Sequence, residues 1–334
     1  MTTTPQTNAT LQEIADELLR VDNIVIAGHV SPDGDCIGSQ LALTLALRAL
    51  GKNVTPTLAA RRTPPASFEN LPLFDDLVYA GDYEGSVDAF VALDVPKTDR
   101  LESAQCALLS SAKHSFTVDH HASDERMTQL AYIDPDCPAC AMLVWQLVKC
   151  LGVELTRDIA QCIYMGVVTD TTSFRNQNTT AECFGVAQEL IKCGVDPSKI
   201  AADAFLNRSK QSLQLESLAI SRMSFAAGGD FAITYLTRAD VKNLDAKPED
   251  SDYIVDTLRS VRGVRVACFL KEIMIDGEIV VKGSLRAKDD TDVSVIARKH
   301  NGGGHKGASG FRMFCSIKDA VQTIRVEFEE YLSE

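Results

Sequence analysis

The sequence lacks any long apolar run. Among its 334 residues, no apolar stretch approaches the roughly 20 residues that a membrane-spanning helix needs. The first ten residues, MTTTPQTNAT, lack the basic and apolar regions of a signal peptide. We therefore expect a soluble, cytoplasmic protein that has no membrane partner.

The sequence also lacks an excess of basic residues. It contains 33 lysines plus arginines against 46 aspartates plus glutamates, which gives a formal net charge of -13. Proteins that hold long duplex nucleic acid normally neutralise its phosphates with a basic face. The charge therefore excludes tight, extended binding to a long duplex, but it leaves open a short anionic substrate that metal ions hold.

A second Cys-x-x-Cys pair is missing as well. The chain has ten cysteines, scattered mostly along apolar helical patterns, and only Cys137 and Cys140 have this spacing. A structural zinc site would need further ligands. We expect these two thiols to be buried at the start of a helix, and the cysteine content fits a reducing compartment.

What is present is an alternation of short apolar runs and helical patterns. The expected strands are residues 23–27, 54–58, 89–93 and 115–118, and the expected helices are residues 37–50, 139–151, 157–168 and 180–193. Continuous apolar strands that alternate with helices are typical of an α/β fold with a doubly wound, mostly parallel sheet. Ligands of such sheets gather at the carboxyl ends of the strands.

The pattern changes after the glycine pair at residues 228–229. Strands are expected at 231–236, 264–275 and 278–285, with helices near 251–261 and 318–332. We predict three parts: a catalytic domain over residues 1–202, a helical linker over 203–224, and a smaller C-terminal α/β domain over 225–334. The active site is expected in the cleft between the two domains.

Acidic residues and histidines fall at four places, each at the end of an expected strand or in the turn beyond it. The residues are His29, Asp33, Asp35, Asp94, Asp119, His120, His121 and Asp170. An aspartate after a strand is commonly a helix cap when it is taken alone. Together, however, six oxygen and nitrogen ligands from this set could surround two divalent cations. The charge of the cations would offset the repulsion between the carboxylates.

The ordered motifs GHVSPDGDCIGS, ALD, VDHH and GVVTDTTSF resemble those of the DHH phosphoesterases, and the later GGGHKGASG is similar to the signature of that family's associated second domain. The resemblance covers nearly the whole chain. It implies metal ligation by His29, Asp33, Asp35, Asp94, His120 and Asp170, with Asp94 and Asp170 as bridging candidates. It also implies catalytic roles for Asp119, which would orient a histidine, and for His121, which would face the phosphate and the leaving oxygen.

The sequence departs from the family pattern at two points that do not remove a ligand. Cys36 stands where many relatives carry alanine, and Val95-Pro96 follows Asp94 where a more polar pair is common. These departures affect the expected substrate preference and leave the expected metal binding unchanged.

Within the family, size and motif spacing are most similar to bacterial enzymes that hydrolyse short RNA (nanoRNA) and 3′-phosphoadenosine 5′-phosphate (pAp). The resemblance therefore implies a phosphoesterase that uses two divalent cations, with Mn²⁺ preferred and Mg²⁺ or Co²⁺ as alternatives. Other functions stay open: a phosphodiesterase for linear or cyclic dinucleotides, a pyrophosphatase or polyphosphatase, or a catalytically silent nucleotide-binding regulator. A homodimer is also left open.

Candidate substrate-binding residues lie in the second domain. The run Asn301 to Gly310 contains Gly303, Gly304, His305 and Lys306, and Arg286 precedes it. Glycines let backbone N–H groups approach an anion closely, and arginine can hold a terminal phosphate with two hydrogen bonds. The alternatives are a flexible turn for the glycines and an exposed strand charge for Arg286.

Overall fold

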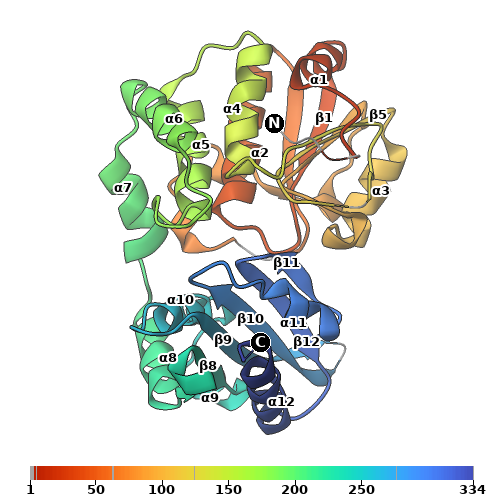
Figure 1. Ribbon diagram of the computed structural model, residues 1–334. Coiled ribbons are helices and arrows are strands. Elements are labelled where there is room, and N and C mark those ends of the chain that lie inside the picture. The colour runs from red at the N-terminus through yellow and green to blue at the C-terminus, as the bar shows by residue number, and fades with distance from the viewer. Residues whose placement is uncertain (1–3, 5, 62–63, 124, 276, 334) are drawn as a thin grey trace. The chain divides into compact units, whose positions relative to one another are not determined.

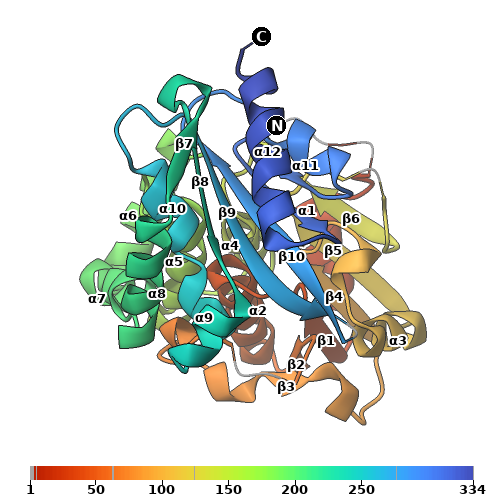
Figure 2. The ribbon, with the colours of Figure 1, turned by 90° about the horizontal axis from the view of Figure 1, so that it is seen from below.

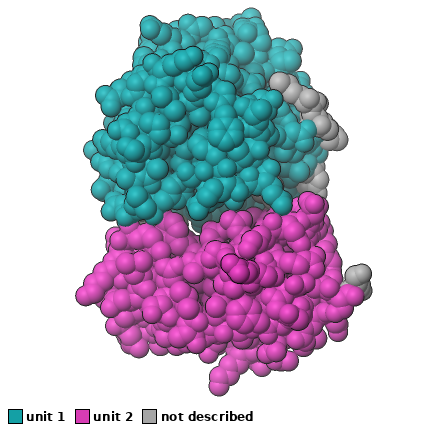
Figure 3. Space-filling view, turned by 60° about the vertical axis from the view of Figure 1, so that its left-hand side comes forward, with its two compact units in different colours: residues 1–207 teal, residues 208–334 magenta. Residues whose placement is uncertain are grey.

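The computed structural model describes residues 4, 6–61, 64–123, 125–275 and 277–333, and the chain divides into two units (Figures 1 and 3). The first unit is Met1–Asn207 and the second is Arg208–Glu334. Among the described residues, no helix is both long and apolar enough to cross a membrane.

The first unit is built on a parallel sheet. Its described strands are β1 (Asn23–Ala27), β2 (Asn53–Leu58), β3 (Val78–Tyr79), β4 (Ala89–Leu93), β5 (His114–Asp119) and β6 (Leu130–Ile133). They lie in the order β3-β2-β1-β4-β5-β6, and every neighbouring pair is parallel. The strand order reverses between β1 and β4, and in doubly wound sheets ligands bind beyond the carboxyl ends of the strands at such a point.

Helices cover both faces of this sheet (Figure 1). They are α1 (Leu11–Leu18), α2 (Gly34–Ala49), α3 (Ser103–Ser111), α4 (Cys140–Cys150), α5 (Arg157–Asp170), α6 (Ala181–Lys192) and α7 (Pro197–Ala201). Short 3₁₀ segments at Ala66–Phe68, Phe74–Asp76, Ala80–Asp82 and Thr98–Arg100 and a π-helical segment at Ala202–Leu206 complete the unit. Sequence signals set the bounds of α2, because Asp33 caps its start and Gly51, with φ 80°, follows its end.

Alternating side chains of the strands divide the core of the first unit into two layers. On β1, Ile24 and Ile26 pack in the cluster that includes α1, α2, α4 and α5. The intervening Val25 and Ala27 pack in a smaller cluster with residues of α3. A strand that is buried on both faces is typical of a parallel sheet. The continuous apolar runs therefore form buried parallel strands, as expected.

The second unit is a mixed sheet with helices on both faces. Its described strands are β7 (Ser224–Ala226), β8 (Phe231–Leu236), β9 (Val266–Ile275), β10 (Glu278–Ala287), β11 (Gly303–His305) and β12 (Ala308–Met313), in the order β11-β12-β10-β9-β8-β7. Only the β8–β9 pair among these strands is parallel. The helices are α8 (Lys210–Ser221), α9 (Arg238–Asn243), α10 (Ile254–Arg259), α11 (Ser294–Lys299) and α12 (Ile317–Tyr331), and a 3₁₀ segment lies at Pro248–Ser251. Figure 2 shows α12 lying along the sheet, where its Phe328 stacks on Phe231 of β8.

The predicted fold class is confirmed: the first unit carries a parallel sheet and the second a mixed one. The strands β3, β6, β7, β11 and β12 were not predicted, because their residues show no distinct apolar pattern. Residues 203–224, which were expected to form a helical linker, contain α8, and Leu215 and Ala219 of this helix pack in one of the cores of the second unit.

Candidate metal centre

Neighbouring strands bring three predicted ligands to one edge of the first sheet. His29 follows β1, Asp94 directly follows β4, and His120 directly follows β5. All three side chains are buried. The carboxyl ends of parallel neighbours share an edge, so this convergence follows from the strand order.

One group of side chains surrounds His29. Its Nε2 atom lies 3.4 Å from Oδ2 of Asp94 and 3.9 Å from Oδ2 of Asp33. The other oxygen of Asp33 accepts the backbone N–H groups of Asp35 and Cys36, each at 3.1 Å, and so caps α2. Asp33 is therefore both a helix cap and a neighbour of the cluster.

A second group surrounds His120. Its Nε2 atom lies 3.4 Å from Oδ1 of Asp94, 3.7 Å from Oδ2 of Asp35 and 3.8 Å from Oδ2 of Asp170. The two oxygens of Asp94 thus face two different groups, one around each imidazole. The backbone of Asp94 is left-handed, with φ 60°, a conformation that non-glycine residues adopt rarely and that concentrates at functional sites.

Backbone groups that the sequence did not point to hold two of these side chains in place. The carboxylate of Asp35 accepts the N–H groups of Cys140 at 2.6 Å and Ala141 at 2.8 Å, at the start of α4. Nδ1 of His120 lies 3.1 Å from the carbonyl oxygen of Cys137. That oxygen can only accept, so the ring proton belongs on Nδ1, and Nε2 faces the carboxylates. This arrangement is typical of a histidine that binds a metal.

The segment of Cys137 and Cys140 thus serves the cluster through its backbone. The expectation that both are buried thiols at a helix start holds for Cys140, the buried first residue of α4, whereas Cys137 is partly exposed. Burial raises the pKa of Cys137 to about 12. Its thiol therefore stays protonated at neutral pH.

Asp170 reaches the cluster from a helix, and the expectation that it follows a strand is wrong. It is the last residue of α5, and the three residues Thr172, Ser173 and Phe174 that follow have φ values of 47°, 58° and 61°. The carbonyl oxygen of Asp170 accepts N–H groups from the side chains of Asn176 and Asn178, each at 3.3 Å. The helix expected over residues 157–168 continues through Asp170, so the aspartate ends a helix and no strand precedes it.

The charges of the cluster indicate that a cation belongs there. Burial, together with the carboxylates of Asp94 and Asp170, raises the pKa of Asp35 well above its usual range. Burial alone would also raise the pKa of Asp94, but the imidazoles of His120 and His29 outweigh it and hold that pKa well below its usual range. The imidazoles thus offset the charge of Asp94 but not that of Asp35, and bound cations can balance both.

The donor set fits divalent metal ions. Oδ1 of Asp94 and Oδ2 of Asp119 are buried without a hydrogen-bond partner, which is costly unless another group compensates the charge. Ligand atoms that share one cation at about 2.1 Å lie about 3.0–3.4 Å apart. The observed separations of 3.4–3.9 Å around His29 and His120 require only small shifts to reach that range.

Asp119 and His121 form a pair at the margin of the cluster. Nδ1 of His121 lies 2.9 Å from Oδ1 of Asp119, which is fully buried, whereas the His121 side chain is 30% exposed. Burial would lower the pKa of His121, but the Asp119 carboxylate outweighs it and raises the pKa to about 9. The structure therefore brings together every catalytic and metal-binding candidate of the first unit.

The candidates of the second unit lie on adjacent strands. Gly303 and Gly304 belong to β11, which pairs with β12, so they are strand residues and do not form a flexible turn. Gly304 has φ 137°, and a Cβ atom there would come within 2.6 Å of the carbonyl oxygen of Ala308. This position therefore requires glycine for steric reasons, whether or not it binds a substrate.

The charged candidates of this unit differ in their surroundings. Lys306 is exposed, and its ammonium group lies 3.6 Å from Asp290. Arg286 on β10 lies between Ala267 and Ala308 on the neighbouring strands, and its guanidinium group donates a hydrogen bond to the carbonyl oxygen of Leu285 at 3.0 Å. The backbone of His305 belongs to β11, but its side chain lies outside the described residues.

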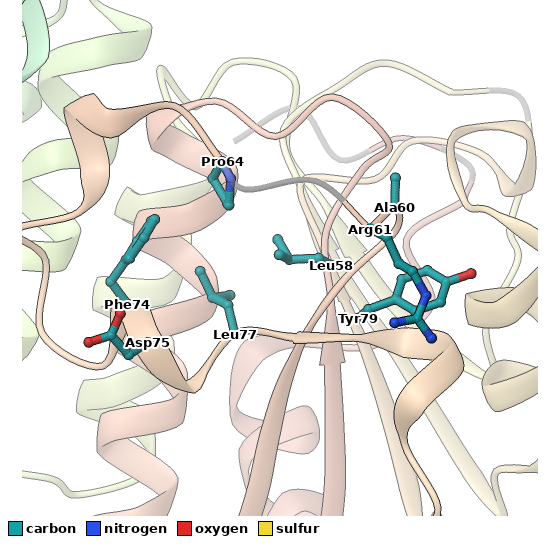
Figure 4. A pocket seen from close by; sticks show the side chains of 8 residues that line it. All are labelled: Leu58, Ala60, Arg61, Pro64, Phe74, Asp75, Leu77 and Tyr79. Carbon is teal, nitrogen blue, oxygen red and sulfur yellow. The ribbon is translucent and has the colours of Figure 1, made fainter.

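A separate pocket of about 400 Å³ lies at the carboxyl ends of β2 and β3. Figure 4 shows Arg61 beside the ring of Tyr79, whose centroid is 4.7 Å from the guanidinium carbon, with Leu58 and Leu77 between this pair and Phe74. Arg61 also forms an ion pair with Asp82. No predicted site residue lines this pocket, so we place the chemistry at the carboxylates and imidazoles near β1, β4 and β5.

Comparison with known proteins agrees with this geometry. Residues 23–167 match the DHH family, N-terminal domain, and residues 228–334 match the DHHA1 domain. The chain is 34% identical over 298 residues to the bifunctional oligoribonuclease and PAP phosphatase NrnA of Thermus thermophilus, which covers 89% of this chain and 86% of that protein. The chain belongs to the DHH family.

Two further relatives match along nearly their whole length. The NrnA protein of Bacillus subtilis is 27% identical over 307 residues, 89% of this chain and 93% of that one. The crystal structure of an exopolyphosphatase-related protein from Bacteroides fragilis superposes with a TM-score of 0.88 at 26% identity, and covers 99% of this chain and 100% of its own. This DHH protein therefore shares its fold with the Bacteroides fragilis protein along nearly the whole chain.

Proposed function

We propose that the chain is a metal-dependent phosphoesterase that hydrolyses short RNA oligonucleotides and pAp. The observation that carries the proposal is the position of Asp94, whose two oxygens each lie 3.4 Å from the Nε2 atom of a different histidine, His29 or His120. The activities named for the Thermus thermophilus and Bacillus subtilis relatives supply the substrate class.

We assign the centre two divalent cations, Mn²⁺ first and Mg²⁺ or Co²⁺ as alternatives, because mixed imidazole and carboxylate ligands suit these ions. Six residues would hold them: His29, Asp33, Asp35, Asp94, His120 and Asp170. When bound, two such cations activate water at neutral pH and offset the negative charge on the reacting phosphoryl group.

The residues of the chain position this chemistry. Asp119 fixes the ring of His121 through Nδ1. We assign His121 the contact with the phosphate and the donation of a proton to the leaving oxygen, because the Asp119 carboxylate raises its pKa and so favours the protonated ring. In-line attack of water then releases a nucleotide or a nucleoside.

The second unit is assigned substrate capture. Arg286 can donate two parallel hydrogen bonds to a terminal phosphate, and Lys306 adds a positive charge. Gly303, Gly304 and His305 contribute backbone N–H groups and, for His305, a ring donor.

In support of the cytoplasmic location that we propose, all ten cysteines are free, as a reducing compartment requires.

A hydrolysis panel tests the proposal. The purified chain, with Mn²⁺ added, is offered pAp, a dinucleotide, a longer RNA, a cyclic dinucleotide and pyrophosphate. We expect turnover of pAp and the dinucleotide that disappears with a chelator and returns with Mn²⁺. Preferred hydrolysis of pyrophosphate or of the cyclic dinucleotide would overturn the substrate class, and inactivity on all five would indicate a nucleotide-binding regulator.

We expect the rate to fall as RNA length increases. The net charge of -13 provides little electrostatic attraction for phosphates beyond those at the site. A series of RNAs from two to about twenty-four nucleotides, compared at equal concentrations of ends, measures this dependence. Fastest degradation of the longest RNA would contradict the prediction.

Replacing Arg286 with alanine should raise KM for pAp by at least about one to two powers of ten, because losing even one of its charged hydrogen bonds costs about 1.5–3 kcal/mol. The rate at saturation and the metal content should change little, because Arg286 lies in a different unit from every proposed ligand. Steady-state kinetics with metal analysis measures both. Arg325→Ala on α12 is the control, since this partly exposed arginine forms an ion pair with Glu329 one turn along the same helix. Equal kinetics of the two variants would exclude the role of Arg286.

A further inference from the structure

Basic side chains lie next to one another on one face of the second sheet. Lys271 of β9 lies directly opposite Lys282 of β10, and Lys282 lies directly opposite Arg312 of β12. Residues that are paired in this way project from the same face of an antiparallel sheet, and like charges directly opposite one another are destabilising. The basic row, as we name these three residues, therefore costs stability unless an anion lies beside it.

An acidic residue compensates one end of the basic row. The ammonium group of Lys271 lies 3.0 Å from the carboxylate of Asp252 and donates to the hydroxyl of Ser251 at 3.0 Å, and its side chain is only 14% exposed. Arg312, at the other end, is exposed and forms no ion pair with any residue that the structure describes. Positive charge therefore remains at the β12 end of the row, in a chain whose net charge is -13.

The face that carries the basic row is open over β10 and β12. The residues of these strands that pack in the core of the second unit, among them Val281, Leu285 and Phe311, belong to the opposite face, where α11 and α12 pack. Lysine on an exposed edge strand is a common protection against pairing with another sheet. That explanation does not apply to Lys282, because β10 lies inside the sheet between β12 and β9.

The same face carries Arg286, the residue assigned to the terminal phosphate. Arg286 lies four residues from Lys282 on β10, which corresponds to about 13 Å along the strand. Between them on this face lies Ser284, opposite the small Gly310 of β12. Every charged side chain in the paired rows from Lys282 to Arg286 is basic. A chain of phosphates can therefore follow β10 from Arg286 to the basic row without meeting a carboxylate in these rows.

We propose that Lys282 and Arg312 hold a phosphate of RNA beyond the terminal phosphate that Arg286 holds, and so strengthen the binding of short RNA strands relative to pAp. This inference rests on the proposed function, which assigns Arg286 the terminal phosphate. In pAp both phosphates belong to one ribose, whereas each further nucleotide of RNA adds a phosphate along the strand. Lys282 and Arg312 contribute charge-assisted hydrogen bonds to such a phosphate, which position the strand without reading its sequence.

Steady-state kinetics of the full chain with Mn²⁺ compare pAp with an RNA of four nucleotides. Arg312→Ala should raise KM for the tetranucleotide by about three- to tenfold, between the effects of losing an exposed ion pair and a charged hydrogen bond. It should leave KM for pAp near the wild-type value. Arg312→Lys keeps the charge and should restore most of the affinity for the tetranucleotide.

Lys318→Ala is the matched control for the loss of one positive charge. Lys318 is exposed near the start of α12, whose apolar residues pack against the opposite face of the sheet. Its replacement should leave both KM values unchanged.

The salt dependence of binding supplies a readout that a purely structural role would not move. Neutralising one phosphate of a single strand contributes about 0.7 to the slope of log K against log salt concentration. Fluorescence anisotropy of a labelled tetranucleotide, recorded with a chelator so that no turnover occurs, gives this slope. The double variant Lys282→Ala/Arg312→Ala should lower its magnitude by about 0.7 relative to the wild type and to Lys318→Ala.

The inference and the proposed function can fail separately. Circular dichroism shows whether each variant folds; if the double variant does not, Arg312→Ala decides, because Arg312 is exposed. A folded Arg312→Ala chain with wild-type KM and salt slope for the tetranucleotide, or with equal losses for pAp and the tetranucleotide, overturns the inference and leaves the proposed function intact. A chain that hydrolyses none of the phosphoesters but shows the change in slope would refute the proposed function and retain the basic row as an RNA contact.

Discussion

Replacing Asp94 with asparagine should reduce Mn²⁺-supported hydrolysis of pAp by at least about 10²- to 10³-fold, the loss that follows removal of one electrostatic group from an active site. Asparagine keeps the shape of the side chain but offers only one oxygen and no charge. Since each oxygen of Asp94 faces a different imidazole at 3.4 Å, the single oxygen of asparagine can serve only one of the two groups, and both groups lose the negative charge. We expect the variant to bind fewer Mn²⁺ ions per chain.

The measurement combines initial rates, metal analysis and circular dichroism of the same preparation. Asp99→Asn is the control, because Asp99 is an exposed carboxylate five residues further along the same segment. It should hydrolyse pAp at the wild-type rate. A folded Asp94→Asn chain with undiminished activity would exclude a centre that Asp94 bridges.

The convergence of ligands from different strands could be predicted from the sequence. His29, Asp94 and His120 each follow a buried apolar run, and parallel strands end at one edge of their sheet. The same pattern included Asp33, Asp35 and Asp170 among the candidates, and the resemblance to the DHH family then assigned the ligand roles. Position was sufficient for His29, Asp94 and His120 because their contacts follow from strand order.

The groups that orient the ligands could not be predicted in this way. The N–H groups that bind Asp35 come from Cys140 and Ala141, more than a hundred residues along the chain. Backbone donors carry no side-chain signal, so sequence pattern cannot assign them to a partner. The short motif Cys-Pro-Ala-Cys predicted the start of a helix. It gave no sign of which carboxylate would accept the N–H groups at that start.

Asp170 shows a different limit. The residues before it, GVVT, are apolar and β-branched, which suits a strand as well as a buried helix. The helix expected over residues 157–168 favours the helical alternative, and the packing of α5 against α2 and α4 agrees with it. The left-handed residues 172–174 after Asp170 include no glycine, so the usual sequence sign of such a turn is missing.

Close packing of α5 against the metal centre leads to a second large effect, at Gly166. A Cβ atom at this position would lie 2.7 Å from Oδ1 of Asp35 and 2.5 Å from the Cβ of Ala141. Gly166→Ala should therefore displace Asp35 from the N–H groups at the start of α4. We expect the free energy of unfolding to fall by about 1–3 kcal/mol, the usual effect of overpacking a core.

The same substitution should weaken Mn²⁺ binding by about tenfold or more, because misorienting a metal-binding side chain typically costs 10- to 100-fold in affinity.

Gly185→Ala is the matched control: Gly185 lies inside the helix α6, and nothing lies within 4 Å of a Cβ atom there. That change should raise the free energy of unfolding by about 0.5–1 kcal/mol through helix propensity and leave Mn²⁺ binding unchanged. Urea unfolding and electron paramagnetic resonance of free Mn²⁺ measure the two quantities for both variants. Wild-type stability and affinity in Gly166→Ala would contradict the prediction, whereas lost stability with normal affinity would mean that α5 shifts as a body and that Asp35 keeps its place.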